Sequence, residues 1–183
     1  MRINKVLYTA FALLLICQQL LAQEAQSNLK WYTDINQAYE LSNKTHKPIF
    51  AFFTGSDWCG WCHKLEADVL SKPGFETWAN KNVILLELDF PRQKKLPEEL
   101  AKQNNSLQQF FRVQGYPTIW IFNMTKTDTT NQFNIVPLGS LGYLRSEPGK
   151  EVTTFIDSAN TILKTMKPNK TAQASKAKKS GKK

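Results

Sequence analysis

Two cysteines three positions apart carry the clearest chemistry in this sequence of 183 residues. Cys59 and Cys62 lie between an apolar run, residues 49–53, and a segment with helical spacing, residues 58–70. Unpaired backbone N–H groups and the helix dipole stabilise a thiolate at the start of a helix, and the thiolate is the nucleophile in disulfide exchange. The spacing therefore predicts that Cys59 is exposed and attacks, and that Cys62, one turn further, resolves the mixed disulfide. Asp57 opposes this effect by placing a negative charge near Cys59.

The first 22 residues predict an exported protein. A short basic start is followed by an apolar run and then by Ala22, which is typical of a cleaved secretory signal; a retained N-terminal anchor is the alternative. Removal of Cys17 would leave Cys59 and Cys62 as the only cysteines. Two cysteines are too few for a disulfide scaffold, so in an oxidising compartment, here the periplasm, the pair favours redox chemistry.

The net charge of +9 belongs to the ends of the chain. Ten of the 24 basic residues lie in residues 1–22 and 164–183, which leaves 14 basic residues against 15 acidic ones between them. A body with a net charge of about −1 does not favour nucleic-acid binding. We expect the Lys-rich segment 168–183 to be a disordered tail with weak contact to anionic envelope surfaces.

The patterning of apolar residues predicts alternating helices and strands that end in a hairpin and a last helix. This alternation is typical of the α/β class. The expected helices are residues 35–44, 58–70, 75–80, 98–113 and 150–166, and the expected strands are residues 49–53, 83–89, 118–122 and 133–136.

Two separated motifs in this order resemble the thioredoxin superfamily, and in particular exported bacterial proteins with a Trp-Cys-Gly-Trp-Cys centre. The motifs are Trp58-Cys59-Gly60-Trp61-Cys62 and Gly115-Tyr116-Pro117-Thr118. The resemblance implies a single thioredoxin-like domain over residues 23–167, with a central mixed β-sheet flanked by helices. It also implies a monomeric thiol-disulfide oxidoreductase without a cofactor, which acts on cysteine-containing protein substrates and a redox partner protein.

The resemblance further implies roles for the residues around the cysteines. Pro117 would be a cis-proline that faces the cysteine pair. Tyr116 would line the substrate groove with it. Independently of the resemblance, Trp58, Gly60 and Trp61 adjoin the sulfurs and are expected to border the same groove, with simple packing as the alternative for the two tryptophans.

The sequence departs from thioredoxin beneath the cysteines. Thioredoxin buries an aspartate in the strand before the motif, and Phe52 stands at the matching position here. Glu66 follows Cys62 by four residues and is therefore expected on the same helical face. It is our candidate proton acceptor, and a purely structural carboxylate is the alternative.

Three other interpretations use the same cysteines. Cys59-Gly60-Trp61-Cys62-His63 matches a c-type haem attachment motif, in which His63 would be an axial ligand with Met124 or Met166 as its partner. The reduced pair could instead capture copper or zinc, although it supplies only half of a tetrahedral site. The third is a non-catalytic binding module. The predicted α/β alternation disfavours haem, the incomplete ligand set disfavours a resident metal, and the presence of both sulfurs disfavours a non-catalytic module, so the oxidoreductase is preferred.

Overall fold

Strand β2 (Ile49–Thr54) is the centre of a five-stranded sheet in the computed structural model, which describes residues 29–126 and 133–165. All six residues of β2 are buried, as expected for a continuous apolar run covered on both faces. On one side, β3 (Ile84–Asp89) pairs parallel with β2 and with β1 (Trp31–Tyr32). On the other side, β4 (Thr118–Lys126) pairs antiparallel with β2 and with β5 (Phe133–Leu141).

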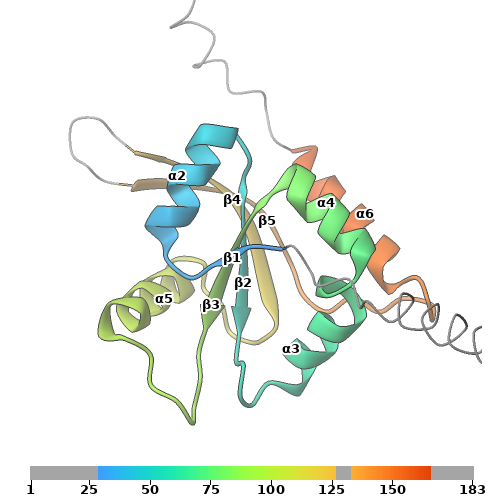
Figure 1. Cartoon of the computed structure of the whole chain (residues 1–183), viewed down its shortest axis with the longest axis horizontal. Coiled ribbons are helices and arrows are strands. Elements are labelled where there is room, and N and C mark those ends of the chain that lie inside the picture. The colour runs from blue at the N-terminus through green and yellow to red at the C-terminus, as the bar shows by residue number, and fades with distance from the viewer. Residues whose placement is uncertain (1–28, 127–132, 166–183) are drawn as a thin grey trace, which may run out of the picture.

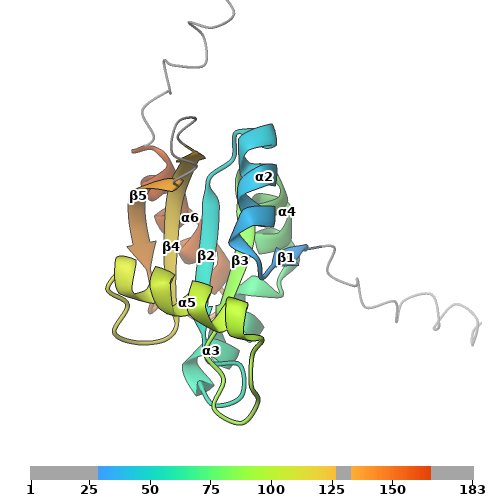
Figure 2. The ribbon, with the colours of Figure 1, turned by 90° about the vertical axis from the view of Figure 1, so that its left-hand side faces the viewer.

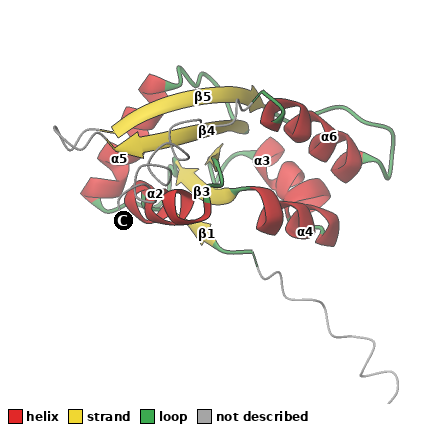
Figure 3. Ribbon diagram, turned by 90° about the horizontal axis from the view of Figure 1, so that it is seen from above, coloured by secondary structure: helices red, strands yellow, loops and turns green. Residues whose placement is uncertain are grey.

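Helices cover both faces of this mixed sheet. Figures 1 and 3 show α3 (Gly60–Leu65), α4 (Pro73–Asn82) and α6 (Glu151–Leu163) on one face. On the opposite face lie α2 (Ile35–Thr45) and α5 (Glu98–Phe110). The arrangement confirms the predicted α/β fold.

The side chains of β2 alternate between two cores. Phe50 and Phe52 belong to the cluster that contains both cysteines and residues of α3, α4 and α6. Ile49, Ala51 and Phe53 belong to the cluster beneath α2 and α5. The cysteine pair is thus anchored in one hydrophobic core.

The helix predicted over residues 58–70 differs in two ways from the structure. It begins at Gly60, and its second part, Glu66–Leu70, is π-helical, with Ser71 N donating to Glu66 O at 2.9 Å. Hydrophobic spacing cannot separate α-helical from π-helical turns, because the two differ by one residue over a single turn.

Other element boundaries also differ from prediction: β4 and β5 continue to Lys126 and Leu141, beyond the predicted ends at residues 122 and 136. The helix predicted over residues 98–113 ends at Phe110, and Arg112 adopts a positive φ of 51°, which ends the helix before Val113. Strand β1 was not predicted, because two residues are too short to show an alternating pattern.

The register brings three segments to the cysteine end of the sheet. Phe53 of β2 pairs with Thr118 of β4, and the next residue of β4, Ile119, pairs with Leu141 of β5. The end of β2, the start of β4 and the end of β5 therefore meet where α3 begins, at the lower end of the sheet in Figure 2.

Within residues 29–126 and 133–165, no helix is long and apolar enough to cross a membrane. Several predictions of the previous section lie outside the described residues. These are the secretory signal with Cys17, the Lys-rich tail 168–183, and Met166.

Candidate active site

The two cysteines form a disulfide at the start of α3. The S–S distance is 2.10 Å and the Cα atoms are 5.2 Å apart. Cys59 is the N-cap residue, and its sulfur accepts a hydrogen bond from the backbone N–H of Cys62 at 3.2 Å. The Cys62 N–H, which also donates to the Cys59 carbonyl oxygen at 3.0 Å, thus points at the Cys59 sulfur, where it would stabilise a thiolate after reduction.

Cys59 is more deeply set than the sequence suggested. It is 5% exposed and Cys62 is fully buried, so the expectation of an openly exposed Cys59 is wrong. Trp58 and Tyr116 pack against the cluster that contains both sulfurs. Cys59 nevertheless remains the more accessible of the two.

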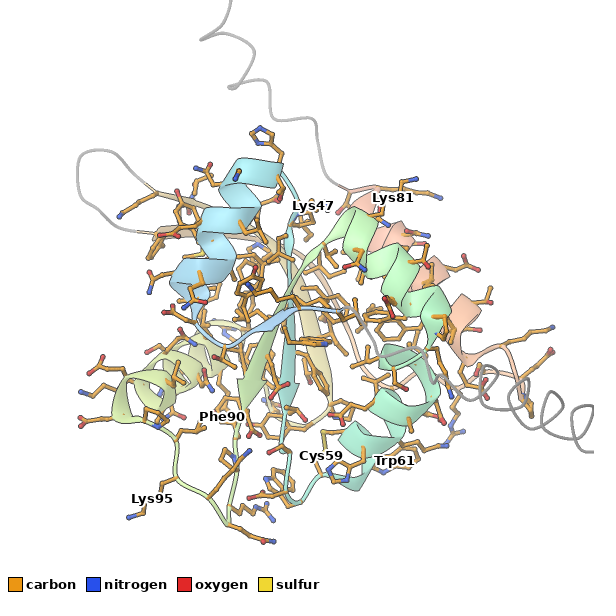
Figure 4. All side chains as sticks on the ribbon, in the orientation of Figure 1. Lys47, Cys59, Trp61, Lys81, Phe90 and Lys95 are labelled. Carbon is orange, nitrogen blue, oxygen red and sulfur yellow. A yellow bond between two sulfur atoms is a disulfide. The ribbon has the colours of Figure 1, made fainter. Side chains whose placement is uncertain are left out.

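The two residues between the cysteines border open space. Trp61 is 60% exposed, and a Cβ atom added to Gly60 would meet no atom within 4 Å. Figure 4 shows Cys59 and Trp61 together at the start of α3. A partner can therefore approach the disulfide from this side.

Trp58 is fixed by contacts on several sides. Its indole N–H donates to the carbonyl of Phe90 at 2.8 Å, and the Arg92 guanidinium lies 3.7 Å from the ring centroid. The ring also lies against Gly55, where an added Cβ would come within 2.4 Å of it. Only a glycine allows this close approach.

Tyr116 and Pro117 lie beside Trp58. The Tyr116–Pro117 peptide bond is cis, which is the isomer implied by the resemblance. The Tyr116 ring packs edge-on against Trp58 with 5.6 Å between centroids, and its hydroxyl accepts a hydrogen bond from Gln108 at 2.6 Å. The structure brings Tyr116 close to the motif, while its role in holding substrate stays a prediction.

The loop after β3 is tied to the loop that carries the motif. The carboxylate of Asp57 accepts backbone N–H bonds from Arg92 at 3.0 Å and Gln93 at 2.7 Å. The bond from Arg92 is the main reason that the pKa of Asp57 is lowered. This negative charge is engaged by the 92–93 backbone, which reduces its expected effect on Cys59.

Asp89 forms a second tie between these loops. Its carboxylate accepts bonds from the N–H and hydroxyl of Ser56, at 2.8 and 2.7 Å, and from Lys94 at 3.1 Å. Burial alone would raise the pKa of Asp89, but these hydrogen bonds outweigh it and lower the pKa. Lys94 is therefore a structural partner of Asp89.

Glu66 lies one turn after Cys62, as predicted, with its N–H directed to the carbonyl of Cys62. Its side chain lines a cavity of about 330 Å³ together with Phe52 and Glu87. Burial is the main cause of the raised pKa of Glu66, and it also raises the pKa of Glu87, which lies near Asp89 and Glu66. Two half-buried carboxylates thus share one cavity on the cysteine face.

Sequence reasoning missed Glu87. Its position in β3 pairs with Phe52, the residue that stands in place of a buried acid. The available signal was an acidic residue within the apolar run Leu85-Leu86-Glu87-Leu88, on the same face of the strand as Leu85.

The residues proposed for haem or metal binding are not brought together. The Nε2 atom of His63 lies 2.9 Å from the carbonyl oxygen of Ser56, so this nitrogen is engaged within the protein. Met124 belongs to the core on the opposite face of the sheet from the cysteines. Among the described residues, no three His, Cys, Asp or Glu side chains gather in a way that could hold a metal ion.

The mixed sheet, its two helical layers, a Cys-x-x-Cys disulfide at the start of α3 and a cis-proline just before β4 define a thioredoxin-like protein. A sequence profile of the thioredoxin-like family matches residues 30–123, and the chain belongs to that family.

Particular relatives are found among proteins named for disulfide chemistry. The chain is 39% identical to "Disulfide bond reductase DsbH" of Chlamydia pneumoniae over 95 residues, which cover 52% of this chain and 57% of the relative. It is 26% identical to "Thioredoxin-related protein DsbJ" of the same organism over 136 residues, which cover 72% of this chain and 37% of the relative. The chain thus spans about half the length, or less, of these curated relatives.

A solved structure extends the comparison over most of the fold. The structure titled "DsbH Oxidoreductase" is 32% identical, with a TM-score of 0.61, and the match covers 78% of this chain and 89% of that chain.

Proposed function

We propose that this protein is a thiol-disulfide oxidoreductase that reduces disulfides in protein substrates. The observation that carries the proposal is the Cys59–Cys62 disulfide at the start of α3, with the Cys62 N–H directed at the Cys59 sulfur. The names of its relatives, a disulfide bond reductase and a thioredoxin-related protein, support this reaction and favour the reducing direction.

The reaction begins from the dithiol form of the protein. The Cys59 thiolate attacks a substrate disulfide, forms a mixed disulfide and displaces one substrate thiolate, which takes up a proton. The Cys62 thiolate then attacks the Cys59 sulfur, so that the Cys59–Cys62 bond forms and the second substrate thiolate leaves. Two electrons and two protons pass from the protein to the substrate, and a dithiol partner protein must restore the reduced form.

The second step requires a proton acceptor for Cys62. This thiol is buried, and burial raises the pKa of a thiol. Glu66 and Glu87 border the cavity on the same face of the sheet, and burial raises the pKa of each carboxyl, which makes it a better base. We assign the proton acceptor to this pair, directly or through one water.

The substrate groove is formed by Trp58, Gly60, Trp61, Tyr116 and Pro117. Trp58 and Tyr116 contact each other, and Gly60 and Trp61 border open space beside the disulfide, which supports the assignment.

The composition of the two terminal segments supports our proposal for the location and domain bounds of the protein. Residues 1–22 form a secretory signal, residues 23–167 the domain, and residues 168–183 a basic tail that contacts anionic envelope surfaces. The protein acts as an exported, periplasmic monomer.

Trapping of substrates tests the function and the order of attack. The mature protein should reduce insulin disulfides with dithiothreitol as the electron donor, and the Cys59→Ser variant should not. The Cys62→Ser variant should accumulate mixed disulfides through Cys59, because the resolving thiol is absent. If Cys59→Ser traps substrates equally well, the order of attack is reversed.

The absorbance spectrum tests the alternative of haem attachment. A covalent haem band in the purified protein would overturn the proposed function.

A further inference from the structure

Trp61 is the most exposed large hydrophobic side chain among the described residues, and it is adjacent to a deeply set disulfide. Its side chain is 60% exposed, compared with 5% for Cys59. Because the reacting sulfur is recessed, a substrate must contact its surroundings before it reaches the sulfur. The exposed indole of Trp61 lies where a substrate that approaches the recessed sulfur would make such a contact.

The indole of Trp61 is supported by a residue from a distant part of the chain. The ring of Tyr143 lies 5.2 Å from it between centroids, at an interplanar angle of 52°. Tyr143 follows the end of β5 by two residues, and the strand register brings that end to the start of α3. An aromatic pair in this geometry adds stabilisation beyond the burial of its area.

The Tyr143 side chain is in turn fixed by its contacts with Asp68 and Lys64. Its hydroxyl donates to Asp68 at 2.7 Å, and Asp68 forms an ion pair with Lys64 at 2.8 Å. The hydrogen bond to Asp68 raises the pKa of Tyr143, which keeps the phenol protonated as a donor. The Lys64 ammonium also lies 5.6 Å from the Tyr143 ring centroid.

The chemistry of the surface that Trp61 and Tyr143 form indicates which side chains it can bind. Lys64 and Asp68 pair with each other, so these two residues add no net charge beside the aromatic face that Trp61 presents. Aromatic faces bind aromatic or large aliphatic side chains well, since both lose contact with water.

We propose that Trp61 and Tyr143 form an aromatic platform that binds an aromatic or large aliphatic side chain next to the reacting cysteine of the substrate. The proposal rests on the proposed function and adds a substrate preference to it. The occupant is a segment of a protein substrate, because the platform is continuous with the disulfide that the substrate must reach. Trp61 contacts the substrate, and Tyr143 is a positioning residue.

The test compares two peptides in single-turnover kinetics with the reduced full-length protein. Each peptide carries one cysteine in a disulfide with glutathione, flanked by phenylalanine in one peptide and by serine in the other, at equal net charge. The wild-type protein is expected to react faster with the phenylalanine peptide at subsaturating concentration. Trp61→Ala and Tyr143→Ala should lower that advantage by about 2- to 12-fold, with little change at saturation or for the serine peptide.

Matched variants separate the platform from general effects on the fold. Phe133→Ala disrupts another exposed aromatic pair, with Tyr39 at 5.1 Å, at the opposite end of β5, and it should leave the preference unchanged. Tyr143→Phe keeps the ring and loses only the bond to Asp68, so its loss should be smaller than that of Tyr143→Ala.

Other outcomes would contradict either the aromatic platform or the proposed function, and the two cases can be told apart. Equal rates of the wild-type protein with both peptides, or equal slowing of both peptides in the alanine variants, would overturn the platform alone. Reaction with neither peptide above the rate of Cys59→Ser would overturn the proposed function itself.

Discussion

Glu66 and Glu87 place two carboxylates at one cavity on the cysteine face of the sheet, and each has a raised pKa. Glu66 belongs to the helical layer and Glu87 to β3, so the two approach the cavity from different elements. We therefore expect either carboxylate to compensate in part for the loss of the other. Their functions are therefore separated only by single and double substitutions.

Loss of both carboxylates should slow resolution more than attack. In Glu66→Gln, Glu87→Gln and the double variant, Gln keeps the size of the side chain but cannot take up a proton. A general base contributes roughly 10²–10⁴-fold, so we expect about that slowing in the double variant and less in each single one. Rapid mixing with a peptide disulfide resolves the two phases. Equal slowing of both phases, or no change, would assign both residues a structural function.

Glu87 should also make stability depend on pH. Its pKa in the folded protein is raised above 4.5, so the folded state binds the proton more tightly than the unfolded state. The free energy of unfolding therefore falls as pH rises from about that value through the folded pKa. Glu87→Gln should raise the melting temperature more at pH 7 than at pH 4. Glu40→Gln, on the exposed side of α2, serves as the control.

At the scale of elements, the loop from β2 to α3 depends on Gly55. An added methyl group would lie 2.4 Å from the Trp58 ring, which is itself fixed by Phe90 and Arg92. Gly55→Ala should therefore destabilise the fold by about 1–3 kcal/mol, as overpacking commonly does. Thermal unfolding followed by tryptophan fluorescence measures the effect. Gly60→Ala is the matched control for stability, because its Cβ would meet open space.

The elements that sequence reasoning located are those with long apolar patterns. β2 and the helix that carries the motif were predicted because five apolar residues in a row and a segment with helical spacing leave strong local signals. β1 is too short for such a signal, and the π-helical turn Glu66–Leu70 leaves none.

The candidate site was predictable where its residues are close in sequence, and for Tyr116 and Pro117, which the family resemblance implied. The cysteine motif was found directly, and Glu66 was found from its distance to Cys62. Glu87 and Tyr143 reach the site through the strand register, by which β3 pairs beside β2 and β5 ends near α3. Such contacts depend on tertiary structure, which one sequence without a template does not define.

At the scale of the whole molecule, the described fold should be complete without the basic segment at the end of the sequence. α6 contributes Phe155 and Ala159 to the core, and the side chain of Asn160 accepts a hydrogen bond from the Trp78 indole at 2.8 Å. Deletion of residues 168–183 should therefore leave the melting temperature and the rate of insulin reduction unchanged. Truncation after Lys150, which removes α6, should abolish cooperative unfolding. A large loss of stability in the shorter deletion would show that the tail packs on the domain.

The strand order has a consequence for the time at which the redox site is assembled. β1 and β2 both depend on β3 for their parallel pairing, and the antiparallel partner of β2 begins only at Thr118. A chain emerging from its N-terminal end can therefore form no part of this sheet before residue 84 is available. Cys59 and Cys62 are only three residues apart, and an oxidant can join them while the rest of the sheet is still absent. A growing chain could thus acquire the bond before the recess that later restricts access to it.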